Sequence, residues 1–147
     1  MKTLPSLLLI LCAVLLAGCE NNAASFVIDE TTKDHSISLV REQSFAWVGP
    51  VEQRFVVSRF PECQRRYLID AATTAMVKVD LYEVRPMLYA AQQGSAWYAL
   101  GTEECVLQKF KEPPPVIPPG RLVGSFEKQA DGSLVFKPVA APKPITP

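Results

Sequence analysis

Residues Met76–Val84 (MVKVDLYEV) form the stretch that decides the fold class. Apolar and charged residues alternate along it, which is typical of a β-strand with one buried face and one exposed face. We expect Val77, Val79 and Leu81 to point inward, and Lys78 and Asp80 to point outward. The β-branched residues strengthen this prediction because they pack well on a pleated surface.

Shorter runs of the same kind lie on both sides of this strand. They cover residues 37–40, 51–60, 66–70, 87–91, 96–100, 105–110, 122–128 and 133–137. Gly49-Pro50, Gln92–Ser95 and Asp131-Gly132 provide turn signals between them. Short strands at a spacing of roughly 8–12 residues predict a mainly β fold, either a small antiparallel sandwich or a partly open barrel.

We expect residues 34–138 to form a single β-rich domain. Within it, residues 112–120 (EPPPVIPPG) are typical of a stiff polyproline connector. The terminal hairpin that follows should belong to the main sheet, because an isolated hairpin is only marginally stable. Pro115–Pro118 resembles a PxxP ligand, but we interpret it as part of the spacer. The Pro-rich tail, residues 139–147, is predicted to be disordered.

The first 18 residues have the organisation of a cleaved signal peptide. Lys2 supplies a positive start, and the apolar run Leu7–Leu16 precedes small residues. This run is shorter than the roughly 20 residues that cross a bilayer as a helix. A permanent membrane span is therefore disfavoured.

Leu16-Ala17-Gly18-Cys19 resembles the lipobox of bacterial lipoprotein precursors. The resemblance implies a diacylglyceryl thioether on Cys19, cleavage before it and acylation of the new amino terminus. Glu20 in place of Asp at the next position favours sorting to the periplasmic face of the outer membrane over the inner membrane. The polar residues that follow predict a flexible tether over 19–33, in which Phe26 to Ile28 are the part able to pack.

Two later segments are Phe60–Arg66 and the stretch from Trp97 to Cys105. Both resemble segments of uncharacterised small envelope lipoproteins of Gram-negative bacteria. This resemblance implies a class and a compartment but no activity.

The lipobox resemblance implies that Cys12 leaves with the signal and that Cys19 carries lipid, so of the four cysteines Cys63 and Cys105 remain. A pair of cysteines in an oxidising compartment predicts one disulfide. Neither lies in a CxxC motif, and together with His35 they lack the spacing of a zinc site. No cofactor or metal is indicated. Equal numbers of basic and acidic residues, 15 each, give no basic field that would attract nucleic acid.

Several polar side chains could form a site. Arg54, Arg59, Arg65 and Arg66 could bind an anion or an acidic partner, although strand parity directs them to different faces. His35 could act as a general base, but it more simply lies exposed before the first strand. Asp80 and Glu83 are expected on different faces of their strand, which disfavours paired-carboxylate catalysis.

Aromatic residues could form a binding surface or fill the core, and core packing is the simpler interpretation. They are Trp47, Tyr82, Tyr89, Trp97 and Tyr98.

Three functions remain open. The sequence favours a non-catalytic, membrane-anchored binding or accessory protein of the cell envelope, and we expect its partner to be another envelope protein. An anchored inhibitor of a lysozyme-like hydrolase would need an inserting loop, and Gln92–Ser95 is a poor match to one. An envelope hydrolase would need His35 or an acidic pair in a pocket.

Overall fold

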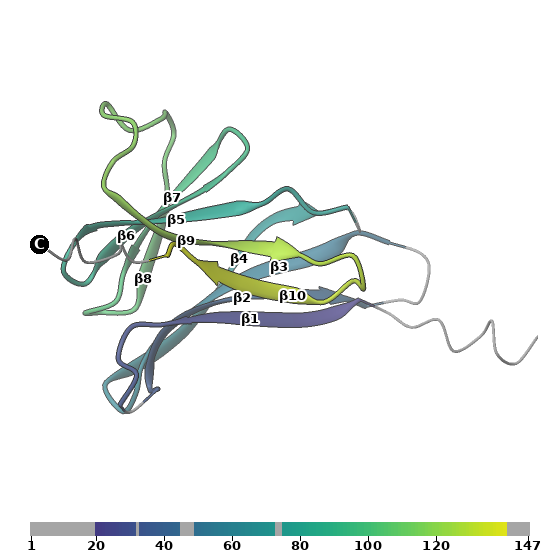
Figure 1. Cartoon of the computed structure of the whole chain (residues 1–147), viewed down its shortest axis with the longest axis horizontal. Helices are drawn as coiled ribbons and strands as arrows, with labels where there is room; N and C mark the ends of the chain where they lie inside the picture. The colour runs from purple at the N-terminus through teal and green to yellow at the C-terminus, as the bar shows by residue number, and fades with distance from the viewer. Residues whose placement is uncertain (1–19, 32, 45–48, 73–74, 141–147) are drawn as a thin grey trace, which may run out of the picture.

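The structure is a computed structural model that describes residues 20–31, 33–44, 49–72 and 75–140. These residues form two antiparallel sheets that pack face to face (Figure 1). The strands are β1 (Asn21–Val27), β2 (His35–Gln43), β3 (Val51–Arg59), β4 (Cys63–Ala72), β5 (Val79–Arg85), β6 (Leu88–Gln93), β7 (Ala96–Gly101), β8 (Val106–Lys109), β9 (Arg121–Lys128) and β10 (Leu134–Pro138).

The first sheet is a meander in the order β1-β2-β3-β4, and the second has the order β10-β9-β5-β6-β7-β8. The prediction of a small antiparallel sandwich is therefore confirmed. The terminal hairpin is part of the second sheet, because β9 pairs with β5. In the described ranges, no helix is long and apolar enough to cross a bilayer.

The core lies between the two sheets and depends on period-two alternation. On β2, Ile37 and Leu39 are fully buried, and their neighbours on β3 are Val57 and Phe55. The Phe55 ring meets two aromatic rings of the second sheet edge-on, those of Tyr98 and Phe126. Such contacts contribute about 0.5–1.5 kcal/mol beyond burial itself.

Side chains close both open edges of the sandwich. At the β1/β10 edge, the rings of Phe26 and Phe136 lie 5.1 Å apart. At the β4/β8 edge, the Cys63–Cys105 disulfide joins the two sheets, and Lys109 Nζ lies 2.7 Å from Asp70 Oδ2. The sheets are thus held together at their margins as well as through the core.

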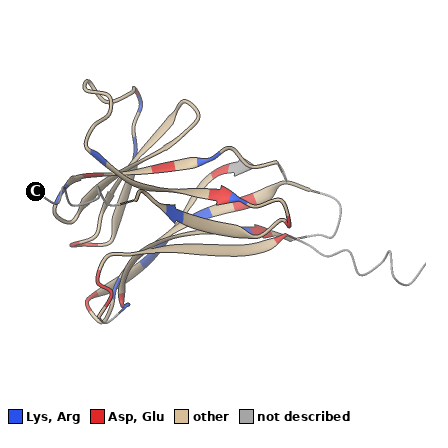
Figure 2. Cartoon of the chain, in the orientation of Figure 1, with Lys and Arg blue, Asp and Glu red and all other residues tan. Residues whose placement is uncertain are grey.

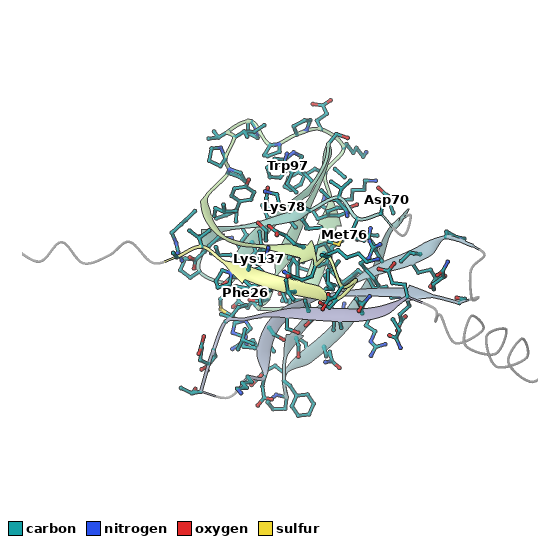
Figure 3. All side chains as sticks on the ribbon, turned by 45° about the vertical axis from the view of Figure 1, so that its right-hand side comes forward. Phe26, Asp70, Met76, Lys78, Trp97 and Lys137 are labelled. Carbon is teal, nitrogen blue, oxygen red and sulfur yellow. A yellow bond between two sulfur atoms is a disulfide. The ribbon has the colours of Figure 1, made fainter. Side chains whose placement is uncertain are left out.

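The polyproline connector crosses the outer face of the second sheet. It leaves β8 at one edge and must pass β7, β6 and β5 before β9 begins. Trp97 belongs to this outer face yet is only 3 % exposed, and it lies beside the connector in Figure 3. At the far side, a Cβ on Gly120 would overlap the carbonyl of Glu83, so only glycine allows the approach. The connector is therefore a strap as well as a spacer.

Three local predictions need correction. The tether prediction for residues 19–33 is wrong from Asn21 to Val27, because β1 pairs with β2 along its whole length and buries Phe26 against the core. Val77 was expected inside but is 58 % exposed, since β5 begins only at Val79. Val139, placed in the disordered tail, donates its backbone N–H to Val123. Residues 141–147 and Cys19 lie outside the described residues.

Candidate functional site

A buried group of charged side chains lies between the sheets where β1 begins. Arg41 is fully buried, and its Nε donates a hydrogen bond of 2.6 Å to Glu20 Oε1. Lys128 Nζ donates to the other carboxylate oxygen at 3.0 Å. The Glu20 side chain is only 6 % exposed. The residue directly after Cys19 is therefore fixed inside the domain.

The group extends into both sheets through amides. Arg41 Nη1 donates to Gln53 Oε1 at 2.7 Å, and Gln53 exchanges hydrogen bonds of 3.2 Å with Gln93. Gln93 also donates to the carbonyl of Val77. These partners satisfy polar groups that would otherwise be costly to bury.

The Glu20 carboxylate is ionised because of its partners. Burial alone would raise the pKa of Glu20, but hydrogen bonds from Arg41 and Lys128 outweigh it and lower the pKa below the usual value. The charge of buried Arg41 is matched in this way. An ion pair of this kind becomes strongly destabilising once one partner is removed.

Sequence reasoning missed this group, although one signal pointed to it. Arg41 follows Ile37 and Leu39 at every second position of β2, so its side chain points to the same face of the strand and enters the core. Glu20 carried no such signal, because β1 was not predicted.

Hydrogen bonds join the start of β1 to neighbouring segments near Glu20. Its carbonyl accepts from the N–H of Gln43, and Asn22 Nδ2 donates to the carbonyl of Gly132 in the β9–β10 turn. Gln43 Nε2 also donates to the carbonyl of Gly49. We call this region the Glu20 end; it comprises Glu20, Gln43, Ser44, Gly49, Pro50 and the turn Gln129–Ser133.

The predicted disulfide is confirmed at the opposite end of the strands. Cys63 begins β4, Cys105 precedes β8, and their Cα atoms are 6.0 Å apart. Tyr67 donates its hydroxyl hydrogen bond to the carbonyl of Cys105 at 2.7 Å. We call this region the disulfide end; it comprises Asp29–Asp34 without residue 32, Phe60–Glu62, Arg85–Met87 and Thr102–Cys105.

A cavity of about 230 Å³ opens at the disulfide end. Its apolar lining includes Pro86 and Met87 between β5 and β6. Leu88, Gly101 and Val106 complete it and are paired neighbours on β6, β7 and β8. Arg85, Glu103 and Glu104 add charge to it. Ligand pockets for small molecules usually measure about 300–1,000 Å³. This cavity is smaller than that range, and its lining mixes apolar and charged side chains.

The four arginines proposed for anion binding separate into two pairs. Arg54 and Arg66 lie on the outer face of the first sheet, and Arg54 forms ion pairs with Glu42 and Glu52. Arg59 and Arg65 lie near the disulfide end, where Arg59 donates to the carbonyl of Glu103 at 3.4 Å. The structure does not bring all four together. Across the view in Figure 2, basic and acidic positions are interspersed over both sheets.

The groups considered for catalysis lie on two strands, Asp80 and Glu83 on β5 and His35 on β2. Asp80 accepts a hydrogen bond from Ser125 and lies 3.0 Å from Lys78, and Glu83 pairs with Arg121. His35 pairs with Arg59 in the β2–β3 ladder. Its Nε2 is the one buried side-chain nitrogen or oxygen without a hydrogen-bond partner in the described part of the chain. Burial and nearby Arg59 lower the pKa of His35.

The aromatic residues are divided between the core and the outer face. Tyr89 and Tyr98 are buried between the sheets. Tyr82 and Trp97 stack with ring centroids 5.8 Å apart. Trp47 lies outside the described residues.

The proposed inserting loop is a short turn. Gln92 and Gln93 belong to β6, which leaves Gly94 and Ser95 as the turn residues. Gly94 has a φ of 58°, which glycine adopts without strain.

Comparisons with known proteins give no relative from which a function could be transferred. No known family profile matches the sequence, and no similar protein was found among curated proteins or solved structures.

Proposed function

We propose that this chain is a lipid-anchored, non-catalytic binding protein of the bacterial cell envelope. Acylated Cys19 attaches it to the periplasmic face of the outer membrane, and the disulfide end contacts an envelope protein. The lipobox-like Leu16–Cys19 supports the anchor. Two acyl chains or more make such an anchor stable, because each buried methylene contributes about 0.8 kcal/mol.

The observation that carries this proposal is the position of Glu20 relative to the cavity. Glu20 is fixed at one end of the strands, whereas Leu88, Gly101 and Val106 line the cavity at the other. An anchor at Cys19 would therefore leave the cavity facing away from the attachment point. Anchoring also raises the local concentration of the protein, so a modest contact suffices for binding.

The two alternative functions have less support. The Gly94–Ser95 turn follows Gln93, which belongs to the buried group at Glu20, so an anchored chain would direct this turn towards the membrane. This position does not suit insertion into a hydrolase cleft. Asp80 and Glu83 are each engaged by a basic neighbour rather than facing one another across the cavity.

In-cell photo-crosslinking tests the binding proposal. A benzoylphenylalanine probe in place of Val106 samples the cavity, and the same probe at Leu68 samples the outer face of the first sheet. We expect one reproducible envelope-protein adduct from position 106 that is absent from position 68. Identical adduct patterns at both positions would contradict binding at the disulfide end.

Membrane fractionation tests the anchor separately. The parent protein should remain with membranes after a high-salt wash, and mass analysis should find a diacylglyceryl group on Cys19. The Cys19→Ala variant should be released in soluble form. If this variant remains in the membrane fraction, the lipid-anchor proposal is wrong.

A further inference from the structure

We propose that the Glu20 end rests directly on the phospholipid headgroups of the membrane that holds the acyl chains. This inference rests on the proposed lipid anchor at Cys19. It concerns what the domain touches, namely a lipid surface, whereas the binding proposal concerns the disulfide end.

The first argument is the length of chain between the anchor and the folded domain. Glu20 is held by its carboxylate and by its backbone carbonyl, which accepts from Gln43 N at 2.8 Å. Consecutive Cα atoms are about 3.8 Å apart. Cys19 therefore lies within one peptide unit of a fixed residue, and no intervening residues are left to act as a spacer.

The second argument is how firmly Glu20 is held. Arg41 and Lys128 come from different sheets, and both bond the same carboxylate. Release of Glu20 would leave the charge of Arg41 buried with fewer partners, which is costly. Fraying of β1 is therefore an unfavourable way to lengthen the connection.

The third argument is the chemistry of the surface around Glu20. The β9–β10 turn consists of Gln129, Ala130, Asp131, Gly132 and Ser133, and Asp131 Oδ1 accepts hydrogen bonds from the backbone and hydroxyl of Ser133. Lys128 beside it keeps 24 % of its side chain exposed. This surface is polar and carries charges of both signs, on Asp131 and Lys128, so it suits the hydrated headgroup layer rather than the hydrocarbon interior.

The test uses the mature, acylated protein in vesicles of phosphatidylethanolamine and phosphatidylglycerol. A benzoylphenylalanine probe replaces Ala130 at the Glu20 end. The matched control places it at Phe60, which is 63 % exposed at the disulfide end. We expect lipid adducts from position 130 to exceed those from position 60 about tenfold, because only the former lies at the headgroup layer.

A second variant inserts 12 Gly and Ser residues between Cys19 and Glu20. Such a linker spans roughly 20 Å as a random coil. It should reduce lipid adducts at position 130 to the control level, while the protein still sediments with vesicles. Equal adducts at positions 130 and 60, or adducts unaffected by the linker, would overturn the inference while leaving the anchor intact. If the parent protein carries no lipid on Cys19 and stays in the supernatant, both the anchor and this inference are wrong.

Discussion

Replacing Glu20 by alanine should destabilise the domain far more than a surface substitution does. The measurement uses residues 19–147 with Ser in place of Cys19. Arg41 is fully buried and receives its carboxylate partner from Glu20. Removing one member of a buried pair costs about 3–5 kcal/mol, because the other charge stays buried without its ionic partner.

Urea denaturation followed by far-UV circular dichroism measures this loss. With an m-value of about 1.5 kcal/mol/M, the midpoint should fall by about 2–3 M. Lys128→Ala is the matched control, since Lys128 is partly exposed and its removal leaves the Arg41–Glu20 pair in place. Its cost should be smaller, about 1.5–3 kcal/mol, because it removes one hydrogen bond to a charged group. A Glu20→Ala variant as stable as Lys128→Ala would refute the reasoning.

The pH dependence gives an independent check on the same pair. The pKa of Glu20 is lower in the folded protein than its usual value of 4.5. As the pH falls, Glu20 therefore binds a proton in the unfolded chain before it does so in the folded protein. Its contribution to the free energy of unfolding is lost as the pH falls from 4.5 to the pKa of Glu20 in the folded state. The parent should lose stability in that range by an amount that the Glu20→Ala variant does not show.

Three further predictions concern other parts of the fold. Replacing Cys63 and Cys105 together by alanine should lower the free energy of unfolding by up to about 4 kcal/mol, measured by urea denaturation against the oxidised parent; an unchanged midpoint would contradict a stabilising bridge. Because the pKa of His35 is lowered from 6.5, the folded state resists protonation, so stability should decrease as the pH falls below 6.5 and the His35→Gln variant should lack this decrease in thermal melts. Gly124→Ala should lower the free energy of unfolding by about 1–3 kcal/mol, since its Cβ would overlap the ring of Phe136. A melting temperature equal to that of the parent would show that β10 adjusts freely.

Much of the fold was predictable because local sequence and burial agree. Val79 and Leu81 alternate with polar residues and point into the core as expected. Asp131-Gly132 and the stretch Gln92–Ser95 marked two hairpins that the structure contains. The remaining cysteine pair gave the disulfide. For the strand and the hairpins a short segment carries its own signal, whereas the disulfide follows from the number of cysteines that remain.

The rest depends on partners that are distant in sequence. β1 is rich in Asn, Ala and Ser, which favour strands weakly, and it forms because Phe26 packs against β10 and its backbone pairs with β2. The proline connector was predicted to be stiff, but its path over Trp97 follows from strand order, which the sequence does not specify. The cavity is equally non-local, since its apolar lining combines three strands.

The separation of Glu20 and Lys128 in sequence, 108 residues, bears on the order of events during biogenesis. If the chain is exported amino terminus first, Glu20 emerges long before Lys128 can reach it. If Cys19 is lipidated as proposed, the modifying enzyme would act in that interval, before the domain has folded. Once β9 has joined the sheet and Lys128 has bound Glu20, the same enzyme would have to work against a folded domain one residue away. On the proposal that Cys19 is lipidated, formation of the Glu20–Lys128 ion pair would limit the time available for that modification, and slower folding of the carboxyl-terminal hairpin would extend it.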